Sequence, residues 1–329
     1  MKKTIKIVLI SLGSLIALLL AFLLFLIING SCNLNYDDET EKFPDWMNEI
    51  KDETYLHNIA IPGSHDAGTS GMNWLGETQQ YSIKEQLELG VRYFDLRVND
   101  NNGKLVIYHS IINGQEFIPI LEDIKEFIKN HPSEVLLLDF QHFKNGSEDE
   151  VYELVTTYLY NDNLLVVNEK NISDLEFITT LRLKEARGKC IVFWGDRSND
   201  LSNYVFLRNN DTGTNKEMAL DSYYFDTYHK KDVDVLIKQF PEYFEKISDK
   251  VDNELRGIFV LQAQLTDGAL IFGPWSKEKV NCDDISEYIK ELVESKYLDS
   301  VNVIMRDFIT GKKAGEIIRL NYYKGISKE

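Results

Sequence analysis

Short apolar runs alternate with longer segments of helical spacing along most of this 329-residue chain. Near-continuous apolar runs are typical of strands that are buried on both faces, and the helices between them supply the crossovers of a parallel sheet. We interpret the following runs as strands: Leu56–Ile61, Val91–Val98, Leu105–His109, Val135–Phe140, Cys190–Trp194, Tyr223–Tyr228, Ile258–Gln264 and Val301–Arg306. We interpret the following segments as helices: Ile83–Leu89, Ile120–Asn130, Ser147–Leu159, Leu175–Ala186, Asp232–Lys246, Asp284–Ser295 and Lys312–Tyr322. The pattern predicts an α/β fold.

Eight strands over about 290 residues fit a single distorted (β/α)8 barrel of the TIM type, with an open doubly wound sheet as the alternative. Polar residues favour the barrel because they fall at or just after the carboxyl ends of the strands, which share one mouth in a barrel. These residues are Asp95, His109, Asp139, Asp226 and Asp307. The sequence has no Gly-rich phosphate-binding motif, so nucleotide binding has no support.

The N-terminal 32 residues are predicted to lie outside the fold. Three lysines precede an apolar run, Ile7–Ile28, that is long enough to cross a bilayer with its basic flank inside. We keep three interpretations: a retained transmembrane anchor, a cleaved signal peptide and a lipidated Cys32. All three place the remaining chain on the extracellular side of the cell membrane or in the medium. Residues 33–52 are polar and acidic and are interpreted as a tether, and residues 53–329 as the barrel domain.

The formal net charge of −17 excludes some partners. Binding to nucleic acid needs a basic face, and electrostatic attachment to anionic lipid needs a basic segment. We therefore expect no nucleic acid partner, and any membrane contact of the barrel domain must be apolar. The three cysteines, Cys32, Cys190 and Cys282, are far apart, so no disulfide framework or zinc spacing is present.

Four segments place two histidines, an arginine and several carboxylates at or after predicted strand ends. They are Ile61–Asp66, Phe94–Arg97, Ile107–His109 and Met305–Asp307. One imidazole can take a proton while another gives one, and a guanidinium can hold the charge that builds on phosphorus. A lone histidine is more often structural, but this combination at neighbouring strand ends predicts attack on a phosphodiester.

These segments resemble the X-domain family of phosphatidylinositol-specific phospholipases C. The chain is similar to the metal-independent bacterial enzymes and to the X-domain-only proteins of animals, from about Leu56 to about Asn321. The matching segments are Ile61–Asp66, Gly90–Arg97, Tyr108–His109, Pro132–Phe140 and Val303–Asp307. The resemblance implies cleavage of phosphatidylinositol-type lipids to diacylglycerol and a 1,2-cyclic inositol phosphate.

The resemblance also implies an acid and a base. His65 would take the proton of the inositol 2-hydroxyl, and Asp307 would hold His65 and stabilise its imidazolium form. His109 would protonate the diacylglycerol oxygen, with Asp66 as its partner. Because the attacking hydroxyl is already tethered next to phosphorus, most of the entropy of meeting is removed.

Arg97 is the residue that bears on metal use. It would bind the phosphoryl oxygens, with Asp95 orienting either Arg97 or His109. The calcium-dependent relatives carry a carboxylate ligand at this position, and an arginine there repels a divalent cation. We expect no metal and no other cofactor; the alternative is calcium held by Asp66, Asp95 and Asp139.

The head-group pocket matches the family less closely. Gln141 and approximately Gly195 stand where the bacterial enzymes carry a lysine and an arginine that contact inositol. Asp226 and Tyr228 resemble the hydroxyl ligand and the tyrosine that stacks under the ring. The substrate-binding residues that we expect are Asp226, Tyr228, Gln141 and Asp139. The preferred head group, phosphatidylinositol or a glycosylated derivative, stays open.

We expect a monomer that works at a membrane surface, with Trp74 and Trp275 as candidates for contact with lipid. One alternative is an enzyme like the glycerophosphodiester phosphodiesterases, but their metal-binding glutamates are not found after His65. The other is a catalytically silent surface protein that binds inositol lipids or glycans. Retention of both histidines argues against it, because binding alone needs neither an acid nor a base.

Overall fold

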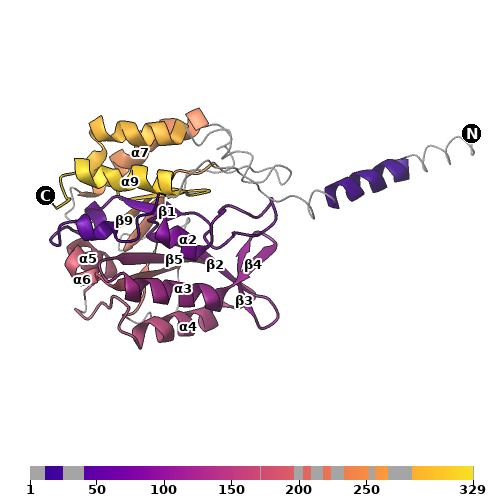
Figure 1. The fold of residues 1–329 in the computed structure, drawn as a ribbon, viewed down its shortest axis with the longest axis horizontal. Helices are drawn as coiled ribbons and strands as arrows, with labels where there is room; N and C mark the ends of the chain where they lie inside the picture. The colour runs from indigo at the N-terminus through magenta and orange to yellow at the C-terminus, as the bar shows by residue number, and fades with distance from the viewer. Residues whose placement is uncertain are drawn as a thin grey trace, which may run out of the picture.

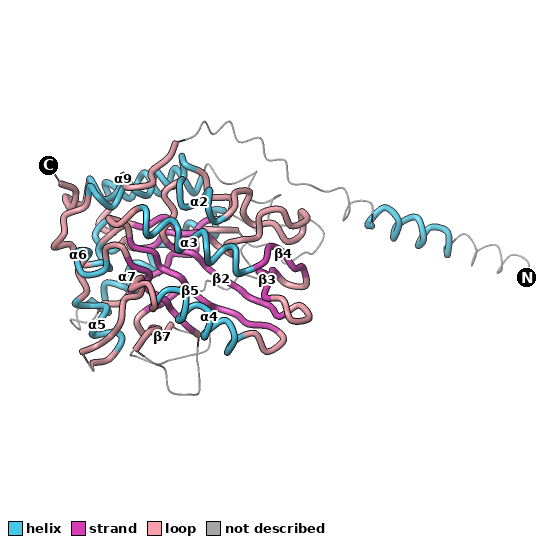
Figure 2. The backbone as a smooth tube through the Cα atoms, turned by 60° about the horizontal axis from the view of Figure 1, so that its bottom comes forward, coloured by secondary structure: helices cyan, strands magenta, loops and turns pink. Residues whose placement is uncertain are grey.

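The computed structural model of the protein describes residues 12–24, 41–170, 172–195, 203–208, 218–223, 233–251, 256–265 and 284–328. Within this part of the chain, eight parallel strands form a nearly closed barrel with helices packed around it (Figures 1 and 2). The predicted α/β class is confirmed.

The strands follow one another around the barrel in the order β1, β2, β5, β6, β7, β8, β9 and β10. Their bounds are Ile61–Ser64, Tyr93–Asp100, Val135–Lys144, Lys189–Trp194, Phe206–Leu207, Leu220–Tyr223, Ile258–Gln262 and Val303–Arg306. At the seam, Arg208 and Leu220 form an isolated parallel bridge. The Ala219 amide also donates to the Leu207 carbonyl oxygen at 2.9 Å, so the seam between β7 and β8 is joined by backbone contacts.

The helices lie on the outer face of the strands. Their bounds are α2 Ile83–Glu88, α3 Phe117–Asn130, α4 Glu148–Tyr160, α5 Asp174–Thr180, α6 Leu183–Ala186, α7 Val233–Val251 and α9 Gly311–Tyr323. A further helix covers 284–291 and continues into the 3₁₀ turn Leu292–Glu294. In α3, Ile120, Ile124 and Phe127 are buried, as their helical spacing predicts. α2 begins at a capping box formed by Ser82 and Glu85.

Alternate residues of each strand enter different clusters of the core. Tyr93, Leu137 and Phe193 belong to one cluster, whereas their neighbours Phe94 and Leu138 pack in the cluster that contains α3. This period of two is expected when one face of a strand lines the barrel interior and the other meets the helices. This alternation determines which residues at the carboxyl ends of β2 and β5 point into the barrel.

The prediction of Leu105–His109 as a barrel strand is wrong in its role, although its bounds match those of β3. β3 runs antiparallel to β2 and pairs with β4, Ile112–Glu116, outside the barrel path. Only four residues separate β2 from β3, and a parallel crossover needs a dozen or more. The two-residue strand β7, which the sequence pattern did not show, is the eighth barrel strand instead.

Several other boundaries differ. Leu56–Asn58 is a 3₁₀ turn before β1, β8 begins three residues before its predicted start, and the helix predicted over Leu175–Ala186 is two helices, α5 and α6. The predicted tether 33–52 includes residues of the folded body, because Trp46, Met47 and Ile50 are buried in the core. These three apolar residues lie within an otherwise polar and acidic segment, and their buried side chains hold this segment against the core.

Both ends of the predicted membrane segment, Ile7–Ile28, fall outside the described residues. Residues 12–24 form a helix with exposed side chains, drawn in indigo in Figure 1. Among the described residues, none of the helices has both the length and the apolar character needed to span a membrane. The signal, anchor and lipidation interpretations stay predictions.

Candidate active site

Polar side chains replace apolar ones on the inner face of the barrel where the strands reach its mouth. Asp95 follows Tyr93 on the inner face of β2, and Asp139 is its paired neighbour in β5. Both carboxylates are fully buried. A buried charge is costly unless it is paired and hydrogen-bonded, so each of these carboxylates needs nearby partners.

His65 and Asp307 meet because their strands are neighbours. Ser64 of β1 is paired with Arg306 of β10, and the next residue of each strand belongs to the site. His65 Nδ1 lies 2.7 Å from Asp307 Oδ1. This contact fixes the imidazole ring and leaves Nε2 as the atom that faces the other site residues.

Asp66 is the residue on which the site converges. Its backbone is left-handed, with φ of 43°, and its amide donates to Asp95 Oδ2 at 3.1 Å. Its Oδ2 lies 3.4 Å from His65 Nε2 and 3.5 Å from His109 Nε2. Its Oδ1 lies 2.6 Å from Arg97 Nε. One buried carboxylate therefore contacts both histidines and the arginine.

His109 reaches the site through the β-hairpin rather than through a barrel strand. β2 extends beyond the mouth, and β3 runs back along it with Val98 paired to Ile107, so the end of β3 returns to the mouth. His109 Nδ1 lies 2.9 Å from the Gly76 carbonyl oxygen. Because a carbonyl oxygen only accepts, Nδ1 carries the hydrogen and Nε2 is left to exchange a proton.

Arg97 occupies the place where a cation would otherwise sit. Its Nη2 lies 3.1 Å from Asp95 Oδ2, in addition to the contact of its Nε with Asp66. Ligand atoms of His65, Asp66 and Asp95 lie within 4.8 Å of one another, which is compact enough for a metal ion. A divalent cation would have to compete with the guanidinium for both carboxylates, so these residues fit a metal poorly.

The charges of the cluster shift one another's protonation. Burial lowers the pKa of His65, but the carboxylates of Asp66 and Asp307 outweigh it and raise the pKa to about 9. Burial opposes ionisation of Asp66, yet Arg97 and His65 hold its pKa well below the usual range. Burial likewise lowers the pKa of Arg97, and Asp66 and Asp95 more than restore it. In the substrate-free protein, His65 is therefore an imidazolium at neutral pH.

A second polar group extends into the barrel from Asp139. Its Oδ2 accepts hydrogen bonds from the Tyr93 hydroxyl at 2.6 Å and from Gln141 Nε2 at 3.1 Å. Its Oδ1 lies 2.7 Å from Arg208 Nε. Burial raises the pKa of Asp139, although Arg208 opposes the shift. The sequence pattern did not predict Arg208, because β7 is too short to show a strand pattern.

The structure connects six of the ten predicted site residues by direct contacts: His65, Asp66, Asp95, Arg97, His109 and Asp307. Two more, Asp139 and Gln141, form the second polar group, in which Asp139 is the paired neighbour of Asp95. The two others, Asp226 and Tyr228, lie outside the described residues, as does Trp275.

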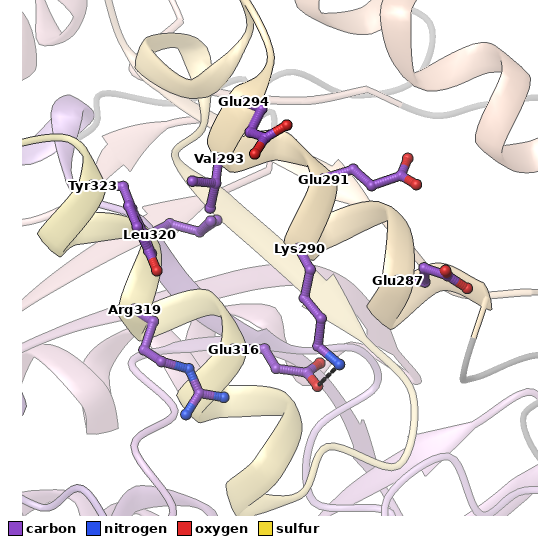
Figure 3. A pocket seen from close by; sticks show the side chains of 9 residues that line it. All are labelled: Glu287, Lys290, Glu291, Val293, Glu294, Glu316, Arg319, Leu320 and Tyr323. Atoms are coloured by element: carbon purple, nitrogen blue, oxygen red, sulfur yellow. Dashed lines mark ion pairs between the residues drawn. The ribbon is translucent and has the colours of Figure 1, made fainter.

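A separate cavity of about 550 Å³ lies between α9 and the segment 284–294 (Figure 3). Its lining residues are Glu287, Lys290, Glu291, Val293, Glu294, Glu316, Arg319, Leu320 and Tyr323. Lys290 Nζ lies 3.1 Å from Glu316 Oε1 across it. None of these residues belongs to the predicted site.

Comparison with known proteins identifies the first half of the barrel. Residues 54–195 match the family model described as phosphatidylinositol-specific phospholipase C, X domain. The predicted resemblance is confirmed. The X domain includes His65, Asp66, Asp95, Arg97 and His109, whereas Asp307 lies beyond the matched residues.

Both predicted groups of relatives are found. A 1-phosphatidylinositol phosphodiesterase of Listeria monocytogenes is 31% identical over 156 residues, which cover 45% of this chain and 47% of the relative. Human PI-PLC X domain-containing protein 2 is 31% identical over 136 residues, covering 30% of this chain and 43% of the relative. The chain spans about half or less of the length of the curated relatives it matches.

Solved structures show the same fold. The phosphatidylinositol-specific phospholipase C from Listeria monocytogenes has a TM-score of 0.68 at 22% identity, and the match covers 85% of this chain and 99% of that one. One from Staphylococcus aureus has a TM-score of 0.63 at 20% identity over 86% of this chain and 99% of that one. At this level of identity the likeness establishes the barrel fold and leaves the activity to be argued from the site.

Proposed function

We propose that this protein is a phosphodiesterase that cleaves phosphatidylinositol-type lipids to diacylglycerol and a 1,2-cyclic inositol phosphate. The observation that carries the proposal is the convergence of His65, His109 and Arg97 on the single carboxylate of Asp66. The match to the X-domain family and the names of the bacterial relatives, which are 1-phosphatidylinositol phosphodiesterases, support it.

The reaction is an internal displacement at phosphorus. His65 Nε2 takes the proton of the inositol 2-hydroxyl as the bond from that oxygen to phosphorus forms. His109 Nε2 gives a proton to the diacylglycerol oxygen as its bond to phosphorus breaks. Arg97 holds the charge on the phosphoryl oxygens. Asp307 orients His65 through Nδ1, and the Gly76 carbonyl oxygen orients His109 in the same way.

The protonation of His65 controls how much of the free enzyme is active. With a pKa of about 9, roughly one molecule in a hundred carries neutral His65 at pH 7. Deprotonation of His65 therefore contributes a rise in kcat/KM of about tenfold per pH unit below pH 9, and this rise is opposed wherever His109, the acid, loses its proton.

The proposal includes no metal and no other cofactor. Arg97 supplies the positive charge that calcium would bring, and Asp66 and Asp95 are engaged with it. The polar group around Asp139, with Gln141 and Arg208, lies on the adjacent inner face of the barrel and supplies hydrogen-bond groups suited to a polyol. Asp226 and Tyr228 are proposed to complete that pocket.

The proposed partner is a membrane surface reached from the extracellular side. Ile111, at the tip of the β3–β4 hairpin, has 83% of its surface exposed and lies two residues from His109. The hairpin contacts the loop that follows Trp74 and Leu75, because the Gly76 backbone packs on Ile112. An exposed apolar tip beside the site suits shallow insertion among lipids. Apolar contact is needed because the acidic net charge does not favour electrostatic attachment to anionic lipid.

One experiment tests the reaction directly. The full-length protein is incubated with phosphatidylinositol in mixed micelles and EDTA, and the phosphorus NMR spectrum is followed. We expect a cyclic phosphate signal that disappears in His65→Ala and in His109→Ala. His131→Ala is the matched control, because His131 pairs with Asp45 on the surface at 2.8 Å.

Each other outcome has a defined meaning. Failure to turn over any inositol lipid, with or without calcium, would overturn the proposed reaction. Lipid binding without turnover would instead support the silent binding protein. Turnover that depends on added calcium would overturn the role given to Arg97.

A further inference from the structure

Two buried residues outside the acid–base set contact both strand ends that carry it. We propose that Thr78 and Gln79 are positioning residues that hold the His65–Asp307 pair closed. This inference rests on the proposed function, in which His65 is the base. Neither residue touches the reacting atoms, so their effect must pass through His65 and Asp307.

Gln79 joins the ends of β1 and β10 with its side chain alone. Its Nε2 donates to the carbonyl oxygens of His65, at 2.8 Å, and Arg306, at 3.0 Å. Its Oε1 accepts from the Ile309 amide at 3.0 Å. The residue is fully buried, and only this orientation of the amide satisfies two acceptors and one donor together. Gln79 therefore binds the residue before Asp307, the residue two after it, and His65 itself.

Thr78 supports the same two loops. Its Oγ1 lies 3.3 Å from the His65 carbonyl oxygen and 3.1 Å from that of Asp66. Its own carbonyl oxygen accepts from the Phe308 amide at 2.7 Å. Thr69 Oγ1 in turn accepts from the amides of Thr78 and Gln79, at 3.1 Å each, and holds the pair in place.

The pairing of β1 and β10 ends before Asp307. The paired register ends at Ser64 and Arg306, and the His65 amide still donates to the Arg306 carbonyl oxygen at 3.1 Å. The chain turns sharply just afterwards on both sides. Asp66 has φ of 43° and Phe308 has φ of 44°. Left-handed backbone at such residues persists only where surrounding contacts fix it. Thr78 and Gln79 supply such contacts for both turns.

Loosening the contact between His65 and Asp307 has an electrostatic consequence. Burial lowers the pKa of His65, Asp66 and Asp307 raise it, and Arg97 lowers it. If Asp307 withdraws, burial is opposed by one carboxylate instead of two, and the pKa of His65 falls. A purely structural role for Gln79 would lower the stability of the protein without moving this titration.

The test measures the His65 titration by NMR on the substrate-free, full-length protein. The variants are Gln79→Met, which removes both donors and the acceptor without adding charge, and Thr78→Val, which removes only the hydroxyl. Thr78→Ser is the conservative variant that restores it. Gln86→Met is the matched control, because Gln86 is also fully buried and donates to a backbone carbonyl, that of Tyr81, at 2.7 Å.

We expect the titration midpoint of His65 to fall by about one pH unit or more in Gln79→Met and Thr78→Val, a tenfold or larger change in proton affinity. Thr78→Ser and Gln86→Met should titrate like the parent. Unchanged titration in the folded variants would overturn the proposal, and Thr78→Val alone decides if Gln79→Met does not fold. Because this readout needs no turnover, an inactive parent protein would overturn the proposed function, while the titration would still decide whether Thr78 and Gln79 position His65.

Discussion

The ion pair between His65 and Asp307 makes a prediction for both stability and activity. Asp307→Asn keeps the size of the side chain and its contact with His65 Nδ1, now 2.7 Å from Oδ1, but removes the negative charge. Burial and Arg97 lower the pKa of His65, and in this variant Asp66 is the remaining carboxylate that raises it. We expect the pKa of His65 to fall by about one pH unit from about 9.

The magnitude follows from the shift. Raising the pKa of His65 from 6.5 to about 9 corresponds to about 3 kcal/mol of folding free energy. Because the folded-state pKa is the higher one, this stabilisation is fully present below pH 6.5 and is lost as the pH rises to about 9. With one of the two carboxylates removed, we expect on the order of 1–2 kcal/mol of it to disappear at low pH.

Two assays follow the effect. Urea unfolding between pH 6 and pH 9 should show the parent losing stability with rising pH and Asp307→Asn losing much less. The limb of the kcat/KM profile that reports deprotonation of His65 should move to lower pH, while the maximal rate falls about 10²–10⁴-fold because no negative charge at residue 307 stabilises the imidazolium that forms when His65 takes the proton. Asp45→Asn, which breaks only the surface pair with His131, should change neither. An ascending limb that stays near pH 9 in Asp307→Asn would refute the reasoning.

Arg97→Ala should lower kcat about 10²–10³-fold with EDTA present, because a donor to the developing charge is lost; a parent activity that EDTA abolishes would contradict this. Ile111→Asp should lower turnover of phosphatidylinositol in vesicles about tenfold and leave a monomeric short-chain analogue unaffected, because only docking changes. An equal loss on both substrates would argue against the hairpin tip. Glu134→Gln should destabilise the fold by about 3–5 kcal/mol in urea, because it leaves the fully buried Arg92, 2.8 Å away, without its counter-charge; a loss below about 1 kcal/mol would contradict this.

The site residues that the sequence predicted are those whose positions follow from short-range spacing along single strands. Asp95 and Arg97 are two residues apart on a strand, so they share a face, and the apolar Tyr93 before them shows that this face is the inner one. His65 and Asp307 each follow a clear apolar strand, and parallel neighbours deliver their next residues to one place. Short-range periodicity therefore suffices for these four.

What sequence did not predict depends on length and on contacts far apart in the chain. β7 has two residues, too few for any period, so neither the seam of the barrel nor Arg208 could be found. The run Leu105–His109 has the same apolar character whether it is parallel or antiparallel. Only the connection to β2, which is too short for a parallel crossover, distinguishes an antiparallel strand from a parallel one.

The contacts of Asp66 explain why an arginine and a metal are alternatives at this site. Asp66 and Asp95 would be the natural oxygen ligands of a cation, and here both are engaged by Arg97. Among the described residues, those contacts use Nε and Nη2, which leaves the N–H groups of Nη1 for a phosphoryl oxygen. The two carboxylates therefore orient the Arg97 guanidinium through Nε and Nη2, and the edge of the guanidinium that carries Nη1 still faces away from them. In the proposed reaction, a substrate phosphate bound at this edge adds negative charge near His65 and disfavours deprotonation of the imidazolium. The attacking hydroxyl would then deliver its proton to the small fraction of neutral His65 that Asp307 holds in place.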